Sequence, residues 1–348
     1  MNQRPLNTPS GPTPGGRPPV PPPPKTGTVP LSSPLQSQTR VASPVMAQKP
    51  PSSTPVQQGS MNNAPYYKKV VESIDQLPSL PAIVTKLIQV VNSPESSADD
   101  AAKLIEKDPG LTSKMIRLAN SAFYGIPRSI SSVSSAVVIL GFNTIRSLVL
   151  SASVMKMFAG SQQPAIDKEK FWRHSITTAM AAKLIVRHFI NVRMMDPESA
   201  FCAGILHDIG KLIFNEYMSK EYVEVTAFAE KNNMSLLDVE TKVLGINHAA
   251  IGKVISDKWA LPLDLEYTLV YHHEPGAADQ LNELVATINY ADLLAHEAGA
   301  SLWENEPVYV AKNNYRSVLN VSDNDHERIL QMLIDSLDKS NEFISIIK

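Results

Sequence analysis

The stretch from Cys202 to Lys211 contains an imidazole, a carboxylate and a lysine ammonium group within a span of five residues. His207 and Asp208 are adjacent in it, Lys211 follows three residues later, and their neighbours are mostly apolar. Residues three apart on a helix share a face, so Asp208 and Lys211 would point the same way and His207 could reach the same point. Burying such groups without partners would cost several kcal/mol. We therefore expect a metal site, a buried ion pair or another functional arrangement here, with Gly210 as a C-terminal helix cap.

Further imidazole and carboxylate side chains are spread along the second half of the chain, within or beside apolar helical stretches. In chain order the whole set is His174, His207, Asp208, His248, His272, His273 and Asp292. Nitrogen and oxygen ligands of these kinds suit iron, manganese or zinc rather than a metal selected by thiolates. The set predicts one or two bound divalent ions. The alternative is a buried hydrogen-bond network that fixes helix packing without a metal.

This series resembles the HD superfamily of metal-dependent phosphohydrolases over residues 171–295. The resemblance implies one metal ion on His174, His207, Asp208 and Asp292, and a second position completed by His248, His272 and His273. If the protein were a hydrolase, Lys211 would hold the phosphate of the substrate. Relatives with HD-GYP domains, which cleave cyclic di-GMP, have a Gly-Tyr-Pro element after the histidine that matches His248. That element is absent here, which argues against cyclic di-GMP hydrolysis.

The residues before this series predict helices only, because no segment alternates polar and apolar residues as a strand does. Proline, aspartate, asparagine and glycine suggest where these helices begin and end. We expect a helix from Pro81 to Asn92, one from its cap Asp108 to about Asn120, one over 133–140 closed by Gly141, and one capped by Asn143 that runs to about Phe158.

Several short motifs in this first half are more specific. They are Leu77-Pro78-Ser79-Leu80-Pro81, Lys107-Asp108-Pro109-Gly110-Leu111-Thr112, Leu118-Ala119-Asn120-Ser121-Ala122-Phe123-Tyr124 and Leu140-Gly141. Together with the region around His207, they resemble the HDOD family, the HD-related output domain, from about Ser73 to His273. The resemblance implies an all-α, multi-helix fold in bacterial signal transduction, often linked to response regulators, motility or second messengers. It implies no established catalytic activity.

Composition divides the chain into four expected regions. Residues 1–65 hold most of the 27 prolines and no aromatic residue, which predicts a disordered tail; a polyproline ligand for an SH3-like groove is the alternative. Residues 66–160 would form an N-terminal helical part, 161–300 an HD-like helical part, and 301–348 a C-terminal helical extension. In that extension Ser322 should cap a helix whose apolar stripe docks on the domain, the alternative being a partner or dimer surface.

Charge and cysteine content narrow the classes of function. The net charge of -2 and the dispersed basic residues of the tail predict no nucleic-acid partner. The single cysteine cannot form an internal disulfide, and no apolar run is long enough for a signal segment or a membrane span. We therefore expect a cytoplasmic protein with no membrane partner.

Two hypotheses for the function follow. The favoured one is a regulatory output module that binds signalling proteins, such as those of a response-regulator or kinase pathway. Such a module would catalyse no reaction, and any bound metal would be structural. The alternative is a metal-dependent phosphohydrolase acting on a nucleotide or cyclic dinucleotide, in which the metal lowers the pKa of a bound water. A nucleotide second messenger could also be a ligand. His296 and His326 lie outside the series and are assigned no role.

Overall fold

The computed structural model describes residues 79–347 apart from 94, 159–164, 190–194, 281, 308–315 and 317–318, together with residues 66, 68, 69, 72 and 77. The chain divides into two units, Met1–Pro51 and Ser52–Lys348, and every described residue belongs to the second. The tail expected over residues 1–65 lies outside the described residues. The boundaries expected at 160 and 300 stay predictions.

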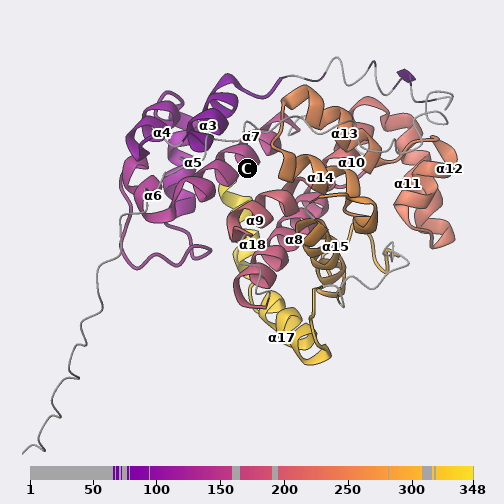
Figure 1. Cartoon of the computed structure of the whole chain (residues 1–348). Helices are drawn as coiled ribbons and strands as arrows, with labels where there is room; N and C mark the ends of the chain where they lie inside the picture. The colour runs from indigo at the N-terminus through magenta and orange to yellow at the C-terminus, as the bar shows by residue number, and fades with distance from the viewer. Residues whose placement is uncertain are drawn as a thin grey trace, which may run out of the picture. The chain divides into compact units, whose positions relative to one another are not determined.

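The described part of the chain is helical and contains no strand, which confirms the all-α prediction. In chain order (Figure 1) the helices are α3 (Ala82–Asn92), α4 (Ala98–Ile105), α5 (Pro109–Ala119), α6 (Val133–Leu140), α7 (Phe142–Met157), α8 (Lys168–His188), α9 (Pro197–Leu206), α10 (Ile209–Tyr217), α11 (Ser219–Asn232), α12 (Leu236–Val243), α13 (His248–Trp259), α14 (Leu263–Tyr271), the 3-10 turn η1 (Pro275–Ala277), α15 (Asn282–Glu297), α17 (Asp323–Ile334) and α18 (Leu337–Ile347).

Helix starts in the first half mostly follow the capping residues. The Asp108 carboxylate accepts a hydrogen bond from the Leu111 amide at 3.0 Å, with proline at the first helical position, as expected. Asn143, by contrast, lies inside α7, which starts one residue after Gly141 and has no side-chain cap. Gly141 supplies the break between α6 and α7 through its positive φ of 84°, a conformation that costs glycine little.

Helix α8 is the centre around which the second half is built. It packs against α9 and α15 and also contacts α17 and α18. The α8 and α9 backbones come close at Gly204, where a Cβ would lie 2.6 Å from the Cα of Ala179. Ile329 and Leu333 on α17 are fully buried, and Ser322 caps this helix together with Asp325, so the apolar stripe docks on the domain as expected. No described helix is both long enough and apolar enough to cross a membrane.

Gly210 has a different role from the predicted helix cap. It lies in the first turn of α10, where a Cβ would be only 2.1 Å from the backbone oxygen of His248. Gly252 of α13 is similar, because a Cβ there would meet Leu269 of α14 at 2.9 Å. Glycine at these positions lets α10, α13 and α14 approach closely, and these helices place part of the candidate site.

Gly210→Ala should therefore destabilise the protein, by about 3 kcal/mol, because the clash is with backbone that cannot rotate away. Urea unfolding would measure the change in the free energy of unfolding. Gly110→Ala in α5 is the matched control, since its Cβ would approach only the Asp108 carboxylate, at 3.3 Å. The control should change stability by less than about 1 kcal/mol. Equal effects of the two substitutions would show that the close approach at Gly210 is not tight.

Candidate metal centre

The structure brings all the predicted ligands to one buried place, although they come from helices far apart in the sequence. His174 lies in α8, His207 and Asp208 at the junction of α9 and α10, Lys211 in α10, His248 at the start of α13, His272 and His273 directly after α14, and Asp292 in α15. None of these residues is more than 7% exposed. Their convergence is what a shared ligand set requires; metal binding itself stays a prediction.

Asp208 lies between two groups of histidines. Its Oδ2 atom is 3.3 Å from His207 Nε2 and 3.6 Å from His174 Nε2. Its Oδ1 atom is 3.3 Å from His248 Nε2 and 3.6 Å from His272 Nε2. The carboxylate can therefore serve two neighbouring cation positions at once, one through each oxygen.

The first position is defined by His174, His207, Asp208 and Asp292. Besides the contacts of Asp208, it contains His174 Nε2 at 3.1 Å and His207 Nε2 at 3.9 Å from Asp292 Oδ1. Metal bonds of about 2.1 Å place neighbouring ligand atoms about 3.0 to 3.4 Å apart. The observed separations are close to this range and need only small adjustments to hold an ion.

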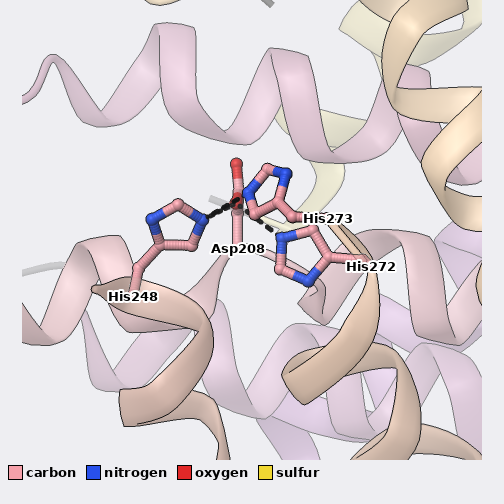
Figure 2. A group of neighbouring side chains, drawn as sticks. All are labelled: Asp208, His248, His272 and His273. Atoms are coloured by element: carbon pink, nitrogen blue, oxygen red, sulfur yellow. Dashed lines mark hydrogen bonds and ion pairs between the residues drawn. The ribbon is translucent and has the colours of Figure 1, made fainter. Parts of the chain in front are cut away.

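The second position is defined by Asp208, His248, His272 and His273, and Figure 2 shows the three imidazoles gathered around the carboxylate. His248 Nε2 and His273 Nε2 are 2.8 Å apart. Burial lowers the pKa of His272 to about 4. Burial, with help from His272 and His248, also lowers the pKa of His273 well below its usual value. Both imidazoles are therefore neutral near pH 7, the protonation state in which histidine binds a metal.

Several ligand atoms of the two positions are buried and lack a hydrogen-bond partner among the described residues. They are His174 Nε2, His207 Nε2, Asp208 Oδ1, His272 Nε2 and Asp292 Oδ1. A buried polar atom left without a partner costs about 1 to 3 kcal/mol. A hydrogen-bond network alone would leave these atoms unsatisfied, whereas a bound cation would satisfy them together. The residues present thus fit a metal better than a network without one.

Backbone carbonyl oxygens orient three of the histidine rings by accepting hydrogen bonds from their Nδ1 atoms. The Nδ1 atoms of His174, His207 and His272 donate to backbone oxygens of Ala300, Gly204 and Thr268 at 2.8, 2.7 and 2.9 Å. Since a carbonyl can only accept, the proton is on Nδ1 and the Nε2 lone pair faces the interior. This arrangement prepares each ring for metal binding.

Glu240 of α12 orients His248 in the same way and was not singled out by the sequence. Its Oε2 accepts hydrogen bonds from His248 Nδ1 at 2.6 Å and from the His248 amide at 2.9 Å, while its Oε1 accepts from the Tyr222 hydroxyl at 2.6 Å. Glu240 is fully buried. The available signal was an acidic residue on the apolar face of a short helix, eight residues before His248.

Glu240→Gln should weaken metal binding at the second position by about 10- to 100-fold, because a neutral amide is a poorer acceptor than a carboxylate. Titration against a competing chelator would measure the affinity. Glu230→Gln on the exposed face of α11 is the matched control and should leave the affinity unchanged. An unchanged affinity in Glu240→Gln would contradict the role assigned to Glu240.

Lys211 is engaged by Asp208 rather than directed at an opening. Its Nζ donates to Asp208 Oδ2 at 2.6 Å, and the residue is 6% exposed. Burial would lower the pKa of Lys211, but Asp208, Glu306 and Asp292 outweigh it and raise the pKa above its usual value. Burial would likewise raise the pKa of Asp208, yet His207 and Lys211 hold it well below the usual value. Both members of the pair, the Asp208 carboxylate and the Lys211 ammonium, are therefore charged.

His296, to which the sequence analysis gave no role, lies beside the first position. It is one helical turn after Asp292 on α15, and its Nε2 is 3.4 Å from Asp292 Oδ1. Its ring centroid is 4.8 Å from that of His174. The spacing of four residues from Asp292 was the signal that could have found it. His326, in contrast, contacts Tyr290 at 2.7 Å and Glu297 at 3.0 Å, which links α17 to α15.

The described residues form a helical fold that encloses a cluster of buried histidines and aspartates. Residues 77–275 match the family model of the HDOD domain, and the chain belongs to the HDOD family. This confirms the resemblance drawn from the sequence motifs.

Three individual proteins are similar to this chain. An HDOD domain protein of unknown function from Geobacter sulfurreducens is 25% identical with a TM-score of 0.66, over 80% of this chain and 98% of that one. A Marinobacter aquaeolei VT8 protein, provisionally named a signal transduction protein, shares the fold at 19% identity and a TM-score of 0.67, over 80% of this chain and 65% of that one. An uncharacterized protein of Treponema pallidum (strain Nichols) is 23% identical over 225 residues, which are 64% of this chain and only 43% of the relative.

Proposed function

We propose that this protein is a regulatory module of bacterial signal transduction that acts by binding other signalling proteins in the cytoplasm. In this proposal the two positions hold iron, manganese or zinc, and the metal stabilises the helical core instead of turning over a substrate. Components of a response-regulator or kinase pathway would be the partners. Membership of the HDOD family and the name given to the Marinobacter protein support the signalling role.

The observation that carries the proposal is the burial of the whole ligand set. The most exposed of the predicted ligands, His273, is only 7% exposed, and Asp208 is 1% exposed. Metal-assisted hydrolysis needs a coordination position that water and a phosphodiester can both reach. A ligand set enclosed by α8, α9, α10 and α13–α15 suits an ion that holds helices together.

The state of Lys211 points the same way. A lysine that binds a substrate phosphate must present its ammonium to the substrate, whereas here it forms a buried ion pair with Asp208 at 2.6 Å. Breaking such a pair costs about 3 to 5 kcal/mol. The lack of the Gly-Tyr-Pro element after His248 adds to this argument.

An HD-type phosphohydrolase acting on a nucleotide or cyclic dinucleotide is the second candidate. The specific observation in its favour is the two-sided contact of Asp208 with both positions, since a carboxylate shared by two ions is suited to two-metal hydrolysis. In that case the metal would supply an activated water when bound, and Lys211 would have to leave Asp208 to hold the phosphate.

A hydrolysis assay on the full chain distinguishes the two candidates. Protein loaded anaerobically with iron or manganese would be incubated with cyclic dinucleotides and with a simple chromogenic phosphodiester. We expect no turnover above that of the free metal. Metal-dependent hydrolysis that is lost in Asp208→Asn, while circular dichroism shows that the variant is still folded at the assay temperature, would overturn the regulatory proposal and establish the enzyme.

A further inference from the structure

A cavity of about 560 Å³ lies beside His296, which neighbours the first position through Asp292. His296 lines this cavity, and its Nε2 is also 3.4 Å from Asp292 Oδ1. The lining also includes Lys170, Arg173, Glu297, Trp303, Glu304 and Glu306. The lining includes none of the second-position histidines. His296 is thus placed between an accessible space and the buried ligand set.

His296 is held in an orientation suited to metal binding. Its Nδ1 is 3.0 Å from the Ser301 hydroxyl oxygen, a contact in which the ring N–H can donate. The Nε2 lone pair then faces Asp292 Oδ1 and His174, and both His174 Nε2 and Asp292 Oδ1 are buried atoms without a hydrogen-bond partner among the described residues. These three side chains offer one ligand atom each within 4.8 Å of one another.

The segment that lines the cavity is tied to the site. Arg173 donates to the Gly299 oxygen at 3.1 Å, next to the bond from His174 to Ala300. Glu306 accepts a hydrogen bond from the Leu302 amide at 2.8 Å, which closes the turn after α15. The cavity wall therefore belongs to the same chain segment, residues 299–306, whose Ala300 carbonyl orients His174.

The charge of the cavity favours a cation over an anion. Three carboxylates line it, from Glu297, Glu304 and Glu306, against the two permanent cations of Lys170 and Arg173. A net excess of fixed negative charge raises the local concentration of cations. A phosphate-bearing ligand would meet an unfavourable excess of negative charge, whereas a divalent metal ion would be attracted.

We propose that His296 is an additional ligand of the first position, and that the cavity beside it is the path by which a divalent metal ion enters and leaves. The first position then exchanges its ion with solvent, while the second, away from the cavity, exchanges slowly. This inference rests on the metal binding included in the proposed function. It makes the first position the one through which metal availability could regulate the module.

Metal release from the full chain tests this directly. Zinc-loaded protein would be mixed with excess chelator, and the released zinc followed with a chromogenic indicator, alongside elemental analysis of the bound zinc. The wild-type protein should hold about two equivalents and release them in a fast and a slow phase. His296→Gln should speed the fast phase by at least about tenfold and leave the slow phase unchanged. His248→Gln should remove the slow phase only.

Two matched controls separate a ligand effect from a change in folding. His188→Gln replaces an exposed histidine at the end of α8 and should leave both phases unchanged. Glu304→Trp should narrow the cavity mouth and slow the fast phase without changing the zinc content, whereas Glu327→Trp on the exposed face of α17 should not. Melting temperatures of all variants would be measured in parallel. If His296→Gln is poorly folded, the comparison of Glu304→Trp with Glu327→Trp decides the question.

The outcomes for this inference and for the proposed function are distinct. Two bound equivalents with a release pattern unchanged in both His296→Gln and Glu304→Trp would overturn the role of His296 and of the cavity alone. A wild-type protein that binds no zinc, iron or manganese would contradict the metal binding itself, and with it both proposals.

Discussion

Asp208→Ala should abolish metal binding at both positions and lower the free energy of unfolding by about 3 to 5 kcal/mol. The carboxylate contacts histidines of the two positions through different oxygens, at 3.3 Å in each case. It also neutralises Lys211, whose ammonium is 2.6 Å away and almost completely buried. Removing the carboxylate would leave that cation buried without its charged partner, which is the larger part of the expected destabilisation.

Elemental analysis and urea unfolding of the purified variant would measure both effects. The double variant Asp208→Ala with Lys211→Met is the informative control, because it removes the stranded charge as well. It should recover part of the lost stability without recovering the metal. A variant Asp208→Ala that keeps its full metal content would show that the carboxylate is not a ligand.

The metal-free protein should lose stability as the pH falls from about 6.5 towards about 4. Burial lowers the pKa of His272 to about 4 and the pKa of His273 well below the usual 6.5, so the unfolded chain binds protons in this window that the folded chain does not. Each such proton lowers the free energy of unfolding by about 1.4 kcal/mol per pH unit. Asp292 raises the pKa of His174 against the opposing effect of burial, which offsets part of this loss.

Urea unfolding of chelator-treated protein at several pH values would measure the dependence. His272→Gln should reduce the slope by about one proton, while His188→Gln, which changes an exposed histidine, should not alter it. The lowered pKa values of Asp208 and Asp292 affect stability only below about pH 5, so they add to the loss at the lower end of this window. Stability that is constant or rises from pH 7 to pH 5 would contradict the predicted burial of neutral histidines.

The sequence predicted the helical fold and the convergence of distant side chains better than it predicted local detail. Through its resemblance to the HD superfamily, the series predicted that His174, His207 and Asp292 belong to one ligand set, and the structure brings these three residues together in the buried core. Glu240 and His296 could not be recognised as easily. A single acidic or imidazole side chain on a helix is usually a surface residue, and only the tertiary contacts reveal that these two face the cluster.

The ends of helices were likewise predicted correctly only where residues close in the sequence determine them. Asp108, Gly141 and Ser322 were predicted correctly because local capping chemistry determines their roles. Gly210 was wrongly assigned as a cap, since its requirement for a missing Cβ comes from the His248 backbone, 38 positions further along the chain. The helix α4 was not anticipated, although Ser97 and Asp100 form a capping box at its start.

The claim that the buried cluster is a metal centre is tested by the metal content of the full chain purified under anaerobic conditions. His174, His207, Asp208, His272 and Asp292 each have a buried ligand atom without a hydrogen-bond partner among the described residues, which predicts iron, manganese or zinc at about two equivalents per chain. Less than about a tenth of an equivalent in a fully folded protein, with no uptake of added metal, would contradict the claim. The cluster would then be a buried hydrogen-bond network that joins the helices without an ion.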